Sequence, residues 1–144
     1  MIRLVLGGEG ENNRGVGLFL FAMHIVYHLP NCGTCQRIIR DLKLAERGFS
    51  LRDIKGQPIQ PRELEEMRAL SGSYASLFSK RAIKYKTMGL KDRVLTEDDI
   101  CGLILEDYTF LKRPVVIVEG ALFAGSEQKT LDMLAEHLAG RDAG

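Results

Sequence analysis

The chain has few cysteines, little net charge and no long apolar run, and each of these features limits the class of protein to which it can belong. It contains only three cysteines, too few and odd in number for the disulfide framework of a small secreted domain. Its formal net charge is +1, so no overall field favours nucleic acid or a membrane surface. The apolar run at residues 18–22 is far shorter than the roughly 20 residues that a membrane-spanning helix needs. We therefore expect a cytoplasmic protein with a single core.

The first 22 residues differ from the rest of the chain, because glycine and polar residues precede the short apolar run. That run resembles the centre of a signal peptide, but Glu9 and Glu11 interrupt the basic leader that such a peptide requires. We interpret residues 1–22 as an N-terminal extension. The domain is expected to span residues 23–140, and residues 141–144 to form a frayed tail.

Cys32 and Cys35 form a C-x-x-C motif between a strand-like apolar run and a helix-like run. A thiol at that junction meets unpaired backbone N–H groups and the positive end of the helix dipole, and both favour the thiolate. The second thiol, one helical turn away, can attack a disulfide formed on the first. The motif predicts redox chemistry. Two inert buried thiols are the plainer alternative, and zinc is disfavoured because a second C-x-x-C is missing.

Hydrophobic periodicity predicts the order β-α-β, a helical insertion, then β-β-α. The strands are expected at 24–28, 49–54, 114–119 and 121–124, the last two as an antiparallel hairpin. Helices are expected at 33–47 and 61–70, with further helices beginning near Thr96 and after Gly125-Ser126. Residues 74–90 are expected to form short helices and loops. Cys101 falls on the apolar face of the helix after Thr96, where core packing is expected.

Three motifs in the same order resemble those of the glutaredoxin-linked arsenate reductase family, which also includes Spx-type regulators. They are Tyr-His-Leu-Pro-Asn-Cys-Gly-Thr-Cys at 27–35, Tyr-Lys-Thr-Met-Gly-Leu at 85–90 and Leu-Lys-Arg-Pro-Val-Val at 111–116. The resemblance covers roughly residues 23–138. It implies an α/β thioredoxin-like fold with a mixed sheet, in which Pro114 is a cis-proline facing the C-x-x-C motif.

The resemblance also implies roles for individual residues. Cys32 matches the nucleophile, and Arg113 matches one of three arginines that hold the substrate anion. Cys35 departs from the arsenate reductase pattern, because it supplies a resolving thiol within the chain itself; the Spx-type regulators carry such a C-x-x-C. The remaining candidates for substrate or anion binding are His28, Gly33, Thr34, Lys80, Arg81 and Pro114. Two arginine positions depart from the family pattern, because Ser79 stands at one and Ala124-Gly125-Ser126 at the other. We therefore expect arsenate reduction to be weak or absent.

Plainer readings of the polar residues stay open. His28 could be a strand-end histidine in contact with water, and Arg113 could form a surface salt bridge. The basic stretch is either a solvated face, the rim of an anion site or a docking surface for an acidic partner; it comprises Lys80, Arg81, Lys84, Lys86, Lys91 and Arg93.

Two functions are compatible with the sequence. The first is a thiol oxidoreductase that reduces an oxyanion or a disulfide, with no bound cofactor or metal and with glutathione and glutaredoxin, or thioredoxin, as external reductant. The second is a redox-sensing regulator of the Spx type that binds RNA polymerase. In either case no direct contact with nucleic acid or membrane is expected.

Overall fold

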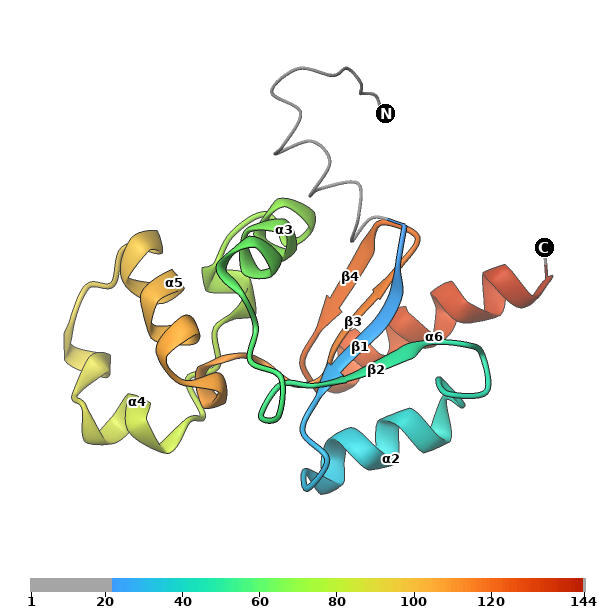
Figure 1. The fold of residues 1–144 in the computed structure, drawn as a ribbon, viewed down its shortest axis with the longest axis horizontal. Helices are drawn as coiled ribbons and strands as arrows, with labels where there is room; N and C mark the ends of the chain where they lie inside the picture. Colours follow the sequence, from blue (N-terminus) through green and yellow to red (C-terminus); the bar gives the residue numbers. More distant parts are fainter. Residues whose placement is uncertain (1–21, 144) are drawn as a thin grey trace, which may run out of the picture.

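The computed structural model describes residues 22–143, so the expected extension lies almost entirely outside the described residues. Its elements are β1 (His24–His28), α2 (Gly33–Asp41), β2 (Ser50–Asp53), α3 (Pro61–Ser71), η1 (Ala75–Leu77), α4 (Ile83–Thr87), η2 (Leu90–Asp92), α5 (Glu97–Glu106), η3 (Tyr108–Phe110), β3 (Val115–Val118), β4 (Ala121–Ala124) and α6 (Gln128–Ala143). Figure 1 shows the insertion with α4 and α5 at one end, and α2 and α6 beside the strands.

The four strands form one mixed sheet in the order β2-β1-β3-β4. β1 pairs in parallel with β2, while β3 pairs antiparallel with both β1 and β4. The parallel pair needs a crossover connection, which α2 supplies, and the antiparallel pair needs only the turn at Glu119 and Gly120. The expected β-α-β, insertion, β-β-α order and the mixed sheet are confirmed.

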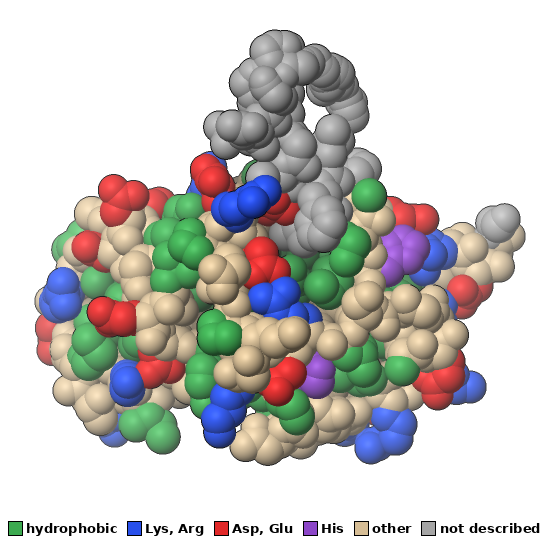
Figure 2. Space-filling view, viewed as in Figure 1, with side chains coloured by type: hydrophobic (Ala, Val, Ile, Leu, Met, Phe, Trp, Pro, Cys, Tyr) green, Lys and Arg blue, Asp and Glu red, His purple; other side chains and the backbone are tan. Residues whose placement is uncertain are grey.

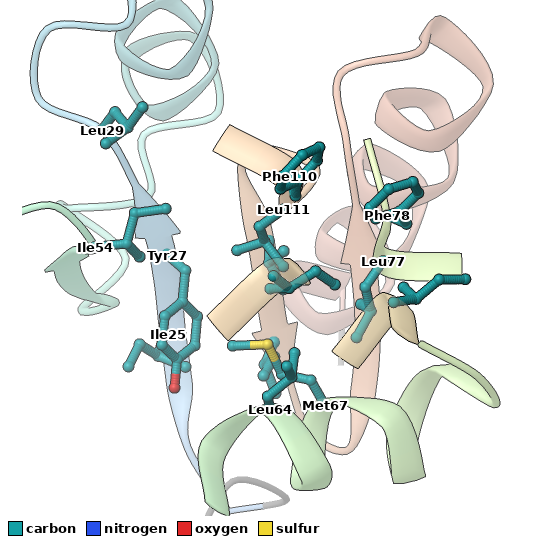
Figure 3. Close-up of a cluster of buried hydrophobic side chains, with 14 of the residues drawn as sticks. Ile25, Tyr27, Leu29, Ile54, Leu64, Met67, Leu77, Phe78, Phe110 and Leu111 are labelled. Atoms are coloured by element: carbon teal, nitrogen blue, oxygen red, sulfur yellow. The ribbon is translucent and has the colours of Figure 1, made fainter. Parts of the chain in front are cut away.

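A hydrophobic cluster lies on each face of the sheet, and β1 contributes to both because its side chains alternate between the two faces. Val26 packs toward one face with residues of α2, β3 and α6. Ile25 and Tyr27 pack toward the opposite face, in a larger cluster with α3, α5 and the turns of the insertion. Figure 3 shows Leu64 and Met67 of α3 in this second cluster. The strand β1 is therefore central to both parts of the core.

The helix after the C-x-x-C motif is shorter than its sequence pattern predicts, since α2 ends at Asp41 rather than at residue 47. Lys43 adopts a left-handed conformation with φ of 53°. The backbone N–H of Leu44 donates to the carbonyl of Ile39 and that of Lys43 to Arg40, which is the pattern of a Schellman cap. This cap turns Leu44 into the core and leaves Ala45 exposed, contrary to the expected apolar face.

The other helices begin where the sequence signals place them. Pro61 occupies the first turn of α3, and the hydroxyl of Thr96 accepts a hydrogen bond from the N–H of Asp99 in a capping box. Cys101 on α5 packs against the larger core cluster, as expected. The final helix continues through Ala143, past the predicted end of the domain at residue 140, and Asp142 pairs with Arg47 at 2.8 Å.

Within residues 22–143, none of the helices has the length and apolar character that crossing a bilayer requires.

Candidate active site

Cys32 lies at the N-cap of α2, where the chain leaves β1 and enters the helix. Its backbone is extended, with φ of −95° and ψ of 110°, and its carbonyl accepts the first helical hydrogen bond, from Gln36 at 3.0 Å. Its N–H donates to the carbonyl of Leu29 at 3.1 Å, which closes the loop after β1. The thiol is partly exposed, whereas Cys35 is completely buried beneath it. The two thiols therefore have opposite access to solvent.

The two thiols also differ in acidity. Partial burial alone would raise the pKa of Cys32, but the N–H and the thiol of Cys35, the charge of Arg113 and the N–H of Thr34 together lower that pKa. Burial raises the pKa of Cys35 to about 11, and the neighbouring Cys32 adds to the rise. Of the two thiols, Cys32 is therefore the one that loses its proton more readily, and it is also the one that solvent can reach.

Cys32 opens onto a cavity of about 520 Å³. Thr34 from the first turn of α2 lies beside it. Four cationic side chains and one carboxylate also line the cavity: Lys80, Arg81, Lys112, Arg113 and Glu127. The rest of the wall consists of Ala75, Phe78, Ser79, Ala124, Gly125 and Ser126. The cavity is therefore predominantly cationic around the more acidic thiol.

A short antiparallel bridge brings the four cations together from two distant segments. Phe78 pairs with Leu111, the N–H of Ser79 donates to Phe110 at 2.7 Å, and the N–H of Lys112 donates to Leu77 at 2.8 Å. The chain on each side of this bridge then carries a pair of basic residues into the cavity, 80–81 from one segment and 112–113 from the other. The insertion thus contributes directly to the wall of the site.

Arg113 is held by the end of the η3 turn. Its Nη1 donates to the carbonyls of Leu111 at 3.1 Å, Thr109 at 3.3 Å and Tyr108 at 3.4 Å. The peptide bond between Arg113 and Pro114 is cis, as the family resemblance implies. Within residues 22–143, these neutral carbonyls are the hydrogen-bond partners of Nη1, and no carboxylate forms a salt bridge with Arg113, which was the plainer reading of this residue. The charge of Arg113 therefore acts to lower the pKa of both cysteines without being offset by a paired carboxylate.

The cavity does not include every residue that the sequence singled out. Cys32, Thr34, Lys80, Arg81 and Arg113 line it, whereas His28, Gly33, Cys35 and Pro114 do not. Cys35 lies beneath Cys32.

His28 is buried at the end of β1, 3.4 Å from Nε2 of Gln36, which also donates to the carbonyl of Leu29. His28 does not line the cavity, and the residue is largely buried, with 7% of it exposed.

Two charged residues of the cavity were missed by sequence reasoning, namely Lys112 and Glu127. Lys112 lies within the Leu-Lys-Arg-Pro motif, and its position next to the predicted site residue Arg113 could have indicated that it belongs to the site. The two positions at which the chain departs from the family pattern do lie at the site, because Ser79 and residues 124–126 line the same cavity as Cys32. Neither position carries a basic residue in this chain.

No cluster of three or more histidine, cysteine, aspartate or glutamate side chains able to hold a metal ion occurs in the described part of the chain.

Comparison with known proteins agrees with this geometry. The sequence profile of the ArsC family matches residues 27–134, from near the end of the strand β1 to the middle of α6. The chain belongs to the ArsC family. Its thioredoxin-like α/β fold, with the sheet order β2-β1-β3-β4, is that of the family's solved structures.

Individual relatives are distant. The chain is 24% identical over 113 residues to an arsenate reductase of Yersinia enterocolitica, which covers 77% of this chain and 80% of the relative. A solved structure described as a possible arsenate reductase from Streptococcus mutans is 27% identical, with a TM-score of 0.63, and covers 78% of this chain and 98% of that one. An arsenate reductase from Vibrio cholerae, 17% identical with a TM-score of 0.60, covers 79% and 98% and shares the fold.

Proposed function

We propose that the chain is a thiol oxidoreductase in which Cys32 is the nucleophile and Cys35 the resolving thiol. The observation that supports this most strongly is the difference between the two thiols. The accessible one has a lowered pKa and faces a cationic cavity, and the buried one keeps its proton. That division suits a reaction in which the first sulfur attacks and the second acts only afterwards.

The first step with a disulfide substrate R–S–S–R is attack by the Cys32 thiolate. A Cys32–S–S–R bond forms, the substrate's S–S bond breaks, and R–S⁻ leaves. The cations around the cavity stabilise the negative charge on the departing thiolate before it takes a proton from solvent. An oxyanion substrate would be attacked at its central atom by the same thiolate: a bond forms between that atom and the Cys32 sulfur, one bond from the atom to oxygen breaks, and the oxygen takes up protons and leaves as water.

The second step uses Cys35. While Cys32 is a thiolate, its charge helps to keep Cys35 protonated. Once Cys32 is bonded to R–S, that charge is gone and the pKa of Cys35 falls, although burial still keeps it raised. Cys35 loses its proton to solvent and attacks the sulfur of Cys32, which releases the second R–S⁻ and leaves a Cys32–Cys35 disulfide. A cytoplasmic thiol reductant of the glutathione–glutaredoxin or thioredoxin type then returns the pair to two thiols.

Mass spectrometry of the protein after mild oxidation tests the assignment. The oxidised chain should contain a Cys32–Cys35 disulfide with Cys101 free. Cys35→Ser should stop the reaction at the mixed disulfide on Cys32, and Cys32→Ser should prevent it. A link between Cys32 and Cys101, or an adduct on Cys35 in the Cys32→Ser variant at the wild-type rate, would contradict the assigned roles.

A redox-sensing regulator that binds RNA polymerase is the second candidate. It is favoured by apolar side chains left exposed in the insertion, since Ile83 is 80% and Val94 is 95% exposed. Figure 2 shows apolar side chains beside basic ones over the end of the molecule that carries α4. Copurification with RNA polymerase, compared between reduced protein and protein oxidised at Cys32 and Cys35, tests this function. Equal recovery in both states, or none in either, would exclude a redox switch of this kind.

A further inference from the structure

Lys112 and Glu127 carry opposite charges on the wall of the cavity. The proposed thiol chemistry gives Glu127 no role, and it gives Lys112 none beyond the positive charge that it shares with the other cations of the cavity. They come from different places in the chain. Lys112 immediately precedes Arg113, and Glu127 immediately precedes α6, where its carbonyl accepts the N–H of Leu131 at 3.0 Å. Both lie in short connecting segments, and hydrogen bonds hold the backbone at each of them.

The position of Lys112 is defined by its backbone and by the stem of its side chain. Its N–H is fixed to the carbonyl of Leu77 at 2.8 Å. Its stem packs over Gly125, because a Cβ atom on that glycine would lie 3.6 Å from Cδ of Lys112 and 3.8 Å from its Cβ. Lys112 thus lies against residues 124–126, the segment where the family pattern has its third arginine. Its ammonium therefore supplies a positive charge beside a segment that has no basic residue of its own.

Neither charge is neutralised within the described chain. Among residues 22–143, no carboxylate lies within ion-pair distance of the Lys112 ammonium, and no cation lies within that distance of the Glu127 carboxylate. Lys84, by contrast, is 2.6 Å from Asp107. Two opposite charges that share a cavity without contacting each other leave room for a ligand between them.

We propose that Lys112 and Glu127 select a disulfide whose thiol half carries both a carboxylate and an ammonium group, as the disulfide of an α-amino acid does. The Lys112 ammonium binds the carboxylate of the disulfide, and the Glu127 carboxylate binds its ammonium group. Cys32, at the start of α2, attacks the sulfur of the disulfide held in this way. This inference rests on the proposed thiol–disulfide exchange. Glu127 also disfavours a multiply charged oxyanion, because a like charge in the cavity opposes its binding.

Three small disulfides allow the effects of Lys112 and Glu127 on the rate to be measured separately. L-cystine carries both groups, 3,3′-dithiodipropionate carries only carboxylates, and cystamine carries only ammonium groups. The measured quantity is the second-order rate constant for loss of free thiols when the reduced full-length protein meets an excess of each disulfide at neutral pH. Each variant is compared with wild type on the same disulfide, so differences in the disulfides' own reactivity cancel.

The two neutralising variants should give opposite patterns. Lys112→Gln should slow oxidation by cystine and by dithiodipropionate about twofold to fivefold, which is the range of a partly solvated charge contact, and should not slow oxidation by cystamine. Glu127→Gln should slow cystine and cystamine by a similar factor and should speed dithiodipropionate. Lys91→Gln and Glu136→Gln change the same charges on exposed residues outside the cavity and should leave all three rates unchanged.

The possible failures are distinguishable. If wild-type protein reacts with none of the three disulfides, the proposed thiol–disulfide exchange is wrong and the inference falls with it. If the protein reacts but both cavity variants alter all three rates equally, or alter none, then the exchange stands and the selection by Lys112 and Glu127 is overturned.

Discussion

Two groups of basic side chains in this molecule differ in whether a carboxylate faces them. Arg52 on β2 is bound by both oxygens of Glu63 on α3, at 2.6 and 2.8 Å, and also donates to the carbonyls of Gln57 and Pro58. At the cavity, Lys80, Arg81, Lys112 and Arg113 have no ion-pair partner within residues 22–143. Charges already paired inside the fold stabilise it, whereas charges left unpaired beside a reactive thiol are free to act on that thiol and its substrate.

The paired group also shows its effect in its pKa values. Burial alone would raise the pKa of Glu63, but its hydrogen bonds with Arg52 and the N–H of Gln60 lower it overall. Tyr27, which donates to Glu63 at 3.3 Å, has its pKa raised, chiefly by burial. All the polar groups of this cluster therefore have partners within the protein, and none is available for a ligand.

Removing the paired arginine should have the largest effect on stability. Arg52→Gln should lower the free energy of unfolding by roughly 1–3 kcal/mol, because Glu63 would remain half-buried without its cation. The rate at which Cys32 is alkylated should not change. Urea denaturation of the reduced protein measures the first quantity. The matched variant Arg81→Gln, at an unpaired cavity cation, should cost less than about 0.5 kcal/mol, and the reverse order would contradict the comparison.

Removing the unpaired arginine should instead change reactivity. Arg113→Gln should slow alkylation of Cys32 several-fold at neutral pH, because the charge that helps to lower the pKa of this thiol is lost. At a pH well above the Cys32 pKa of the variant, Cys32 is ionised in both proteins, so the alkylation rates of wild type and variant should converge. Lys91→Gln serves as the control for a general change in surface charge. A rate difference that persists at high pH would assign Arg113 a different role.

Arsenate turnover should be weak in the unmodified chain. The wall at Ser79 and at residues 124–126 lacks two arginines of the family pattern, and Glu127 adds a negative charge. Ser126→Arg should raise the apparent affinity for arsenate several-fold in an NADPH assay coupled through glutathione and glutaredoxin. Gly125 is less suitable for this substitution, because its φ of +100° strains any other residue. Wild-type turnover of about 1 per second or more would contradict the prediction.

A smaller effect is expected at the edge of the insertion, where Lys84 and Asp107 pair at 2.6 Å. Hydrogen bonds from Lys84 and Thr109 lower the pKa of Asp107 from its ordinary value of 3.8 to about 2. Because the folded-state pKa is the lower one, the pair stabilises the fold above about pH 4 and loses this contribution as the pH falls toward 2. Asp107→Asn should therefore reduce stability at neutral pH and match wild type near pH 2. A stability difference that does not depend on pH would contradict this origin.

Much of the fold was predictable because its signals are local. The apolar run of β1, the Val-Val-Ile-Val run of β3 and the capping box at Thr96 each act within a few residues. The end of α2 was not predictable, because Ala45 continues the apolar period and only tertiary packing selects Leu44 instead. That choice depends on Val26 and Phe49, which lie outside the helix.

The site was predictable only in part. Cys32 and Arg113 stand in motifs, and Lys80 and Arg81 neighbour one. Lys112 was missed because adjacent residues of an extended chain usually face opposite sides, so Lys112 and Arg113 were not expected to share a cavity. Glu127 was missed because it lies in the connection between β4 and α6, outside every motif that the sequence analysis used. One of the two readings of His28 placed it at the site, and its burial next to Gln36 could not be predicted from its separation of four residues from Cys32.

The most direct measurement is the pH dependence of alkylation of each thiol, followed by mass spectrometry in the Cys32→Ser and Cys35→Ser variants. Cys32 should react rapidly at neutral pH and titrate below the range of an ordinary cysteine. Cys35 should react slowly until the pH approaches its raised pKa, which is about 11 in the intact pair. Faster reaction of Cys35 than of Cys32 at neutral pH would contradict the division of labour between the two thiols.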